Sequence, residues 1–94
     1  MAEVELVLYV TGKGPLARKA MADVEQLRAE HLGDEAELTV IDTVAQGEQA
    51  AAAKVRVTPT LIKRRPPPER RVVGDLAEAR RVLAALGLVA RGKG

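Results

Sequence analysis

Three consecutive prolines, Pro66–Pro68, constrain the fold of this 94-residue chain more than any other feature. They separate two short runs rich in β-forming residues, "TLIKRR" at 60–65 and "RRVV" at 70–73. Proline has no backbone N–H and fixes its own φ near −65°, so it is excluded from the interior of a sheet ladder but stiffens a connection. The pattern predicts two strands, 60–65 and 70–73, joined as an antiparallel pair by a rigid bridge.

The first half of the chain predicts a strand, a helix and a second strand. Residues 4–10, "VELVLYV", are nearly all apolar, as in an interior strand covered on both faces. The turn cluster "TGKGP" follows, and Pro15 suits the first turn of a helix of about 17 residues that ends near Gly33. Residues 38–41 form a short second strand, which completes a βαβ unit. The predicted apolar stripe of the helix consists of Leu16, Ala20, Met21, Val24 and Leu27.

The second half adds two helices around the proline-bridged pair. Residues 50–54 read as a short helix that begins near Gly47. Asp75 is a good N-cap for a closing helix from Leu76 to Leu88. The order β-α-β-α-β-β-α predicts an α/β sandwich with a mixed sheet. We expect residues 1–94 to form a single domain whose tail, 90–94, is frayed.

Composition excludes several kinds of chemistry. The chain has no cysteine, which removes disulfides, thiolate zinc sites and a cysteine nucleophile. His31 is the only histidine and is expected to be solvated, so no metal site or other cofactor is predicted. The "GKG" at 12–14 is too short for a phosphate-binding P-loop. Tyr9, the only aromatic residue, is expected to pack in the core with its hydroxyl at the rim.

Hydropathy indicates a soluble, cytoplasmic protein. The longest apolar run, 82–90, is far shorter than the roughly 20 residues that span a bilayer, and no signal peptide is visible. We therefore expect no membrane association.

Charge is divided between the two halves of the chain. Residues 1–53 carry 4 Lys/Arg and 10 Asp/Glu, whereas residues 54–94 carry 11 and 3. Such polarity favours binding of acidic surfaces by the second half, or self-association of opposite ends, although ordinary solvated charges are an equal alternative.

Four further segments form a distinctive set: "LYVTGKGP" at 8–15, "LTVID" at 38–42, "TPTLIK" at 58–63 and "PPPERRVVGDL" at 66–76. Together they resemble the KaiB family, the small partner proteins of the cyanobacterial circadian clock. The resemblance runs from about residue 4 to residue 76. It implies a thioredoxin-like fold, with the rearranged ground-state KaiB fold as the alternative. The loop that carries C-x-x-C in redox thioredoxins carries "GKGP" here, which excludes thiol–disulfide chemistry.

The resemblance implies a non-enzymatic binding protein that switches between two folds. Its partner would be a KaiC-like ATPase, with a KaiA-like protein or a histidine kinase that carries a KaiB-like domain as further partners. Lys54 matches a family lysine that contacts the ATPase ring. With the basic side chains around it, the expected partner-binding residues are Lys54, Lys63, Arg70 and Arg71. The expected fold-switch residues are Pro59, Pro66, Pro67, Pro68, Gly74 and Asp75, with a cis bond at Pro59.

Two departures from the family bear on the state of the chain. Arg64 and Arg65 precede the prolines where apolar residues are expected, and the chain ends basic rather than acidic. The closing segment is also rich in Ala, Leu and Arg, which favour helix. We therefore predict that the thioredoxin-like state dominates.

The alternative function is a small basic nucleic-acid-binding domain, which the lysines and arginines of 63–71 prompt. The lack of aromatic stacking platforms argues against it. An enzyme is disfavoured because no candidate nucleophile–base pair is present.

Overall fold

A computed structural model describes residues 3–89 of the chain. Its elements are β1 (Val4–Val10), α1 (Pro15–Leu27), β2 (Ala36–Asp42), α2 (Gly47–Ala52), β3 (Thr60–Arg65), β4 (Arg70–Val73) and α3 (Ala79–Ala85). The strands form one sheet in the order β2-β1-β3-β4. Strand β1 is parallel to β2 and antiparallel to β3, and β3 is antiparallel to β4. This is the predicted thioredoxin-like α/β arrangement.

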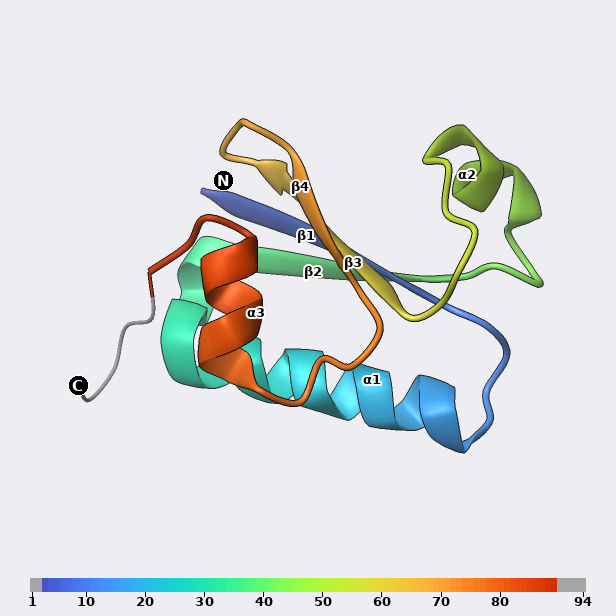
Figure 1. Cartoon of the computed structure of the whole chain (residues 1–94), viewed down its shortest axis with the longest axis horizontal. Coiled ribbons are helices and arrows are strands. Elements are labelled where there is room, and N and C mark those ends of the chain that lie inside the picture. The colour runs from blue at the N-terminus through green and yellow to red at the C-terminus, as the bar shows by residue number, and fades with distance from the viewer. Residues whose placement is uncertain (1–2, 90–94) are drawn as a thin grey trace.

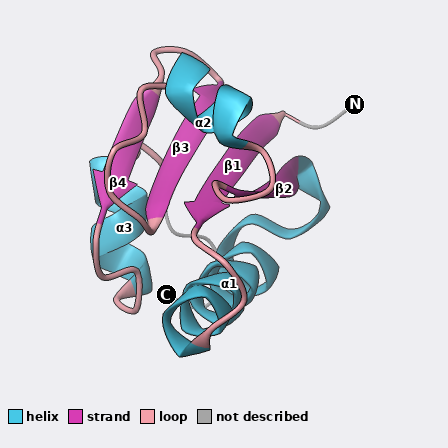
Figure 2. Cartoon of the chain, turned by 90° about the vertical axis from the view of Figure 1, so that its right-hand side faces the viewer, coloured by secondary structure: helices cyan, strands magenta, loops and turns pink. Residues whose placement is uncertain are grey.

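The sheet separates a large core from a small one. Helices α1 and α3 lie on one side of the sheet and α2 on the other (Figures 1 and 2). The larger cluster lies between the sheet and the two helices and includes Leu6, Leu8 and Leu61, all fully buried. The smaller cluster lies under α2 and consists of Val7, Tyr9, Ile41, Ala50 and Ile62. Helix α2 has only six residues, so it covers only part of this face of the sheet. Polar side chains cover the rest.

Tyr9 is buried as the sequence predicted, whereas His31 is not solvated as expected. Tyr9 is 2% exposed, which confirms its place in the core. The side chain of His31 is only 14% exposed and lies 3.9 Å from a Glu30 carboxylate oxygen, so the expectation that it is solvated is wrong.

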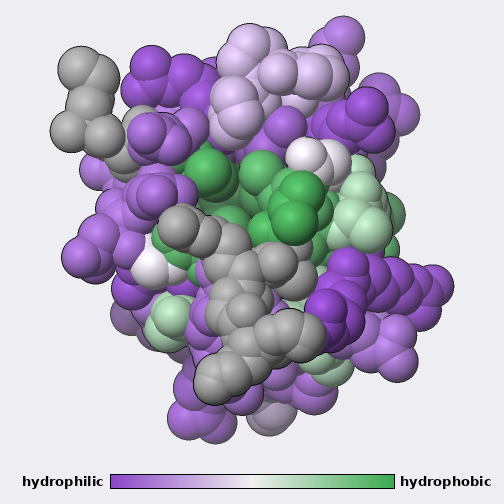
Figure 3. Space-filling view, turned by 90° about the vertical axis from the view of Figure 1, so that its left-hand side faces the viewer, coloured by the Kyte–Doolittle hydropathy of each residue, from purple (hydrophilic) through white to green (hydrophobic). Residues whose placement is uncertain are grey.

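Seen from the side that lies on the left in Figure 1, a patch of apolar surface is ringed by hydrophilic side chains (Figure 3).

Helix α1 buries three residues of the predicted stripe, Ala20, Val24 and Leu27, but Ala17 is buried in place of Leu16 and Met21. The buried residues are Ala17, Ala20, Val24 and Leu27, whereas Leu16 is 78% exposed and Met21 lies at the surface. The α-helical part ends at Leu27, and a π-helical turn (Arg28–Leu32) and a 3₁₀ turn (Gly33–Glu35) lead into β2. Strand β2 is also longer than the predicted 38–41.

The closing helix is shorter than predicted, and Asp75 is not its N-cap. The Asp75 carboxylate accepts a hydrogen bond from the Ala77 N–H over 3.0 Å, which closes a turn before the helix. Leu76 is buried in that turn, and α3 begins at Ala79. The helix ends at Ala85. Gly87 follows with a φ of 74°, which suits glycine, and the Leu88 N–H donates to the Leu83 carbonyl in a Schellman-type cap. The predicted tail, 90–94, lies outside the described residues.

Candidate partner-binding surface

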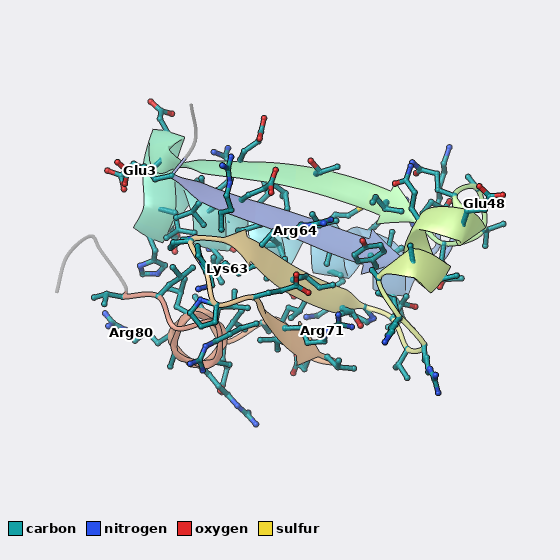
Figure 4. The ribbon with its side chains drawn as sticks, turned by 90° about the horizontal axis from the view of Figure 1, so that it is seen from above. Glu3, Glu48, Lys63, Arg64, Arg71 and Arg80 are labelled. Carbon is teal, nitrogen blue, oxygen red and sulfur yellow. The ribbon has the colours of Figure 1, made fainter. Side chains whose placement is uncertain are left out.

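A hollow of about 460 Å³ lies on the sheet face that α2 only partly covers. Its floor is apolar and includes Tyr9, Ile41 and Ile62. Three cationic side chains line it: Lys54 after α2, Arg64 at the end of β3 and Arg71 on β4. Figure 4 labels the two arginines. Glu69 is the only carboxylate among its lining residues. The hollow therefore combines an apolar floor with a positive rim, which suits an apolar side chain flanked by acidic ones.

Arg71 ties strand β4 to the C-terminal end of α2. Its guanidinium donates to the Ala53 carbonyl over 2.9 Å and to the Lys54 carbonyl over 3.5 Å. The last carbonyls of a helix have no partner within the helix, and a cation there also opposes the negative end of the helix dipole. Glu69 lies 3.6 Å from the same guanidinium. Arg71 thus holds one wall of the hollow in place.

Lys54 ends α2 in a backbone conformation that is unusual for a residue with a side chain. Its φ is +60°, the left-handed region where glycine normally ends helices. The Lys54 N–H donates to the Ala51 carbonyl over 3.0 Å, and the Val55 N–H donates to the Ala50 carbonyl over 2.9 Å. The cost of the left-handed backbone is offset by these bonds, and the result is an exposed ammonium group beside the hollow.

The four predicted partner-binding residues do not share one face of the sheet. Lys54 and Arg71 line the hollow. Lys63 is 3% exposed, so in this fold its side chain is not available to a partner. Its register partner Arg70 lies toward α3, where the guanidinium approaches Gly87. Successive strand residues point to opposite faces, which explains the division.

Arg64 was not among the predicted binding residues, yet it lines the hollow. The pairing of β1 with β3 passes from Leu6↔Lys63 to Glu5↔Arg65, so Arg64 is the extra residue of a bulge. Alternation from the buried Ile62 places Arg64 on the α2 face and Lys63 on the other. That alternation was visible in the sequence and could have favoured Arg64 over Lys63.

The six predicted fold-switch residues lie at two separate ends of the β3–β4 pair. Pro59, Gly74 and Asp75 come together at one end, where they line a groove of about 320 Å³ with Leu16 and Lys19 of α1. The Gly74 N–H donates to the Pro59 carbonyl over 3.0 Å, and Gly74 has a φ of 101°. The Thr58–Pro59 bond is cis, as expected. Pro66, Pro67 and Pro68 form the connection at the other end, and cis bonds precede Pro66 and Pro68.

The "GKGP" loop is anchored by hydrogen bonds from the neighbouring strand ends. The Asp42 carboxylate accepts from the Gly12 and Val44 N–H groups, each over 2.9 Å. The bond from Gly12, followed by that from Val44, lowers the pKa of Asp42 below its usual value. The Thr11 hydroxyl lies 2.8 Å from that of Thr58 and 3.0 Å from that of Thr43. These contacts fix the loop.

The described residues contain neither a metal-binding cluster nor a membrane-spanning helix. Within 3–89, no three His, Asp or Glu side chains are grouped so that they could hold a metal ion. Over the same residues, no helix is both long and apolar enough to cross a bilayer. The single aromatic side chain, Tyr9, is buried, which leaves no exposed ring on which a nucleic-acid base could stack.

The fold and the basic hollow define a thioredoxin-like protein without the redox cysteines, whose surface is suited to binding another macromolecule. Solved structures with a similar fold support the assignment to the thioredoxin-like class. The N-terminal domain of SasA from Synechococcus elongatus superposes with a TM-score of 0.72 at 25% identity, covering 93% of this chain and 86% of that one. The thioredoxin Deadhead of Drosophila melanogaster superposes with a TM-score of 0.72 at 19% identity, covering 89% of this chain and 81% of that one.

The chain belongs to the KaiB family. The KaiB domain model matches residues 7–88. The circadian clock protein KaiB3 of Synechocystis is 38% identical over 92 residues, which cover 98% of this chain and 90% of the relative. The circadian clock oscillator protein KaiB of Synechococcus strain RCC307 is 44% identical over 85 residues, which cover 89% and 76% respectively. This is a family of non-enzymatic clock proteins, and the chain is accordingly not an enzyme.

Proposed function

We propose that this protein is a cytoplasmic adaptor that docks on a KaiC-type ATPase through the basic hollow beside α2. The observation that carries the proposal is the convergence of Lys54, Arg64 and Arg71 around an apolar floor. Lys54 is also the residue that matches the family's ATPase-contacting lysine. A KaiA-like protein, or a histidine kinase with a KaiB-like domain, is a further partner that the same family membership suggests.

The rim cations would act in two ways. They would raise the rate of encounter with an acidic surface, and they would pair with carboxylates around the apolar contact. Arg71 is partly engaged with Ala53, Lys54 and Glu69. Lys54 and Arg64 are therefore the two side chains with most freedom to contact a partner.

Binding of the purified chain to a KaiC-type ATPase tests the proposal. The titration is run with the ATPase in its ATP- and ADP-bound forms, because family members are expected to distinguish nucleotide states. The variant Lys54→Ala/Arg64→Ala is compared with Arg80→Ala, which removes an exposed cation from α3, on the opposite side of the sheet. We expect the double variant to weaken binding at least tenfold and Arg80→Ala to leave it unchanged. Equal effects of the two, or no binding in either nucleotide state, would refute the hollow as the docking site.

We further propose that the described thioredoxin-like state is the resting state and that Pro59, Pro66–Pro68, Gly74 and Asp75 belong to the region that rearranges if the chain switches fold. The helix formers of 76–88 favour this state. Backbone NMR shifts of residues 78–88 test it. Helical shifts are expected, and strand shifts would overturn the assignment of the resting state.

A further inference from the structure

The sheet has two free edges in the described part of the chain, the outer sides of β2 and β4. The Thr43 N–H donates to Val10 of β1, so alternation turns the backbone groups of Leu38 and Val40 away from β1. The Gly74 N–H donates to Pro59, so the backbone groups of Arg71 and Val73 point away from β3. Each edge therefore offers two residues whose N–H and C=O groups are directed outward.

The two edges carry opposite charge. Strand β2 contains Glu37 and Asp42 and no Lys or Arg. Strand β4 contains Arg70 and Arg71 and no carboxylate. Charges on an edge strand normally prevent pairing with another sheet. In this protein the edge charges oppose pairing between two β2 edges or between two β4 edges. They favour pairing of the β2 edge of one copy with the β4 edge of another.

We propose that copies of this chain associate head to tail, with the β2 edge of one copy paired to the β4 edge of the next. This is distinct from the proposed docking through the hollow, which lies on a face of the sheet. Strand β4 runs parallel to β2, since each of the two antiparallel pairings reverses the chain direction. Continuing the sheet with its helices on the same side therefore produces a parallel β4–β2 pair (Figure 2).

The surface beside β4 has room for the side chains of a strand that pairs with it. A groove of about 320 Å³ runs between β4 and α3. Its lining includes the apolar Val72, Val82 and Ala85, two arginines, Arg71 and Arg81, and one carboxylate, Asp75. Pairing would also cover Val40 of β2 and Val73 of β4, which are 38% and 53% exposed. Backbone bonds, charge and apolar contact thus all favour the same arrangement.

Such a contact joins two different surfaces, so each added copy leaves one edge of each kind free. The assembly therefore grows beyond a dimer as concentration rises. It also weakens with salt, since the screening length falls from about 30 Å at 0.01 M to about 3 Å at 1 M.

Two edge-blocking variants test the arrangement by sedimentation of the full chain at about 0.01 M ionic strength. Val40→Pro removes an outward N–H from β2, and Val73→Pro removes one from β4, while neither N–H takes part in the existing ladder. Val40→Thr and Val73→Thr are the matched controls, and far-UV circular dichroism checks folding. We expect each proline variant to be monomeric alone. An equimolar mixture should form a dimer and nothing larger, because only one complementary pair of edges remains.

A charge variant tests the same contact without proline. Glu37→Lys on β2 should raise the dissociation constant of the self-association by up to about fivefold, in line with exposed ion pairs. A wild-type chain that stays monomeric at high concentration and low salt would overturn the proposal. So would dimers of Val73→Pro alone, which indicate β2–β2 pairing, dimers of Val40→Pro alone, which indicate β4–β4 pairing, or a mixture that remains monomeric.

Discussion

Replacing Arg71 with alanine should loosen α2 without unfolding the protein. The guanidinium of Arg71 is the side-chain cap of the last carbonyls of α2, at 2.9 Å from that of Ala53 and 3.5 Å from that of Lys54. Hydrogen bonds from charged groups contribute about 1.5–3 kcal/mol. This side chain is 36% exposed and its second contact is long, so we expect about 1 kcal/mol, which is below that range.

Amide hydrogen exchange measures this loss directly. The N–H groups of Ala53, Lys54 and Val55 donate to carbonyls of α2, and they report the opening of that helix. A change of about 1 kcal/mol corresponds to roughly a fivefold loss of protection at these three amides. Arg70→Ala removes the same charge from the same strand on the opposite face, and it should leave them unchanged. The reasoning is refuted if Arg71→Ala leaves the three amides as protected as before, or if Arg70→Ala exposes them equally.

Three further predictions concern the backbone at Lys54, the carboxylate of Asp42 and the register of α1. Lys54→Gly should raise the free energy of unfolding by up to about 1 kcal/mol, and Lys54→Val should lower it by about as much, because φ is positive there; the opposite order in urea denaturation would disprove strain. The lowered pKa of Asp42 adds stability that is present above the ordinary value of 3.8 and is lost as pH falls through the lower folded-state value. Asp42→Asn should therefore flatten the acid limb of the curve of stability against pH, and an unchanged limb would contradict this. Leu27→Ala should cost about 2–5 kcal/mol while Leu16→Ser costs less than about 0.5, since Leu27 is 1% and Leu16 78% exposed. Comparable losses in thermal melts would mean that Leu16 is buried with Leu27, as the sequence predicted.

The sequence predicted the strands better than the helix boundaries. Strand β1 and the β3–β4 pair have the predicted bounds, because apolar runs and prolines mark both ends of each. The register of α1 was not predictable in the same way. Stripes through Leu16 and Ala17 both continue through Ala20 and Val24, and only packing against the sheet places the small Ala17 inside.

Two errors at the end of the chain have different causes. The delayed start of α3 depends on Leu76, which enters the core before the helix begins, and on the turn that Asp75 closes. Neither follows from helix propensity. The end of α3 at Ala85, two residues before Gly87, was signalled in the sequence by a glycine after an Ala/Leu run and could have been predicted.

The candidate surface was predictable only in part. Basic side chains around residues 54–71 indicated a positive surface, and Lys54 and Arg71 lie on it. Charge alone could not show that Lys63 is buried, because a lysine with its stem in a core has the same sequence signature as a solvated one.

The hydrogen-exchange footprint of this chain bound to a KaiC-type ATPase is the most direct test of the docking surface. The proposed mode predicts new protection in residues 47–56 and 62–71, around the hollow, with little change in α1 and α3. Protection confined to the α1 and α3 side, or none at saturating ATPase, would contradict the claim that the protein acts by presenting this hollow.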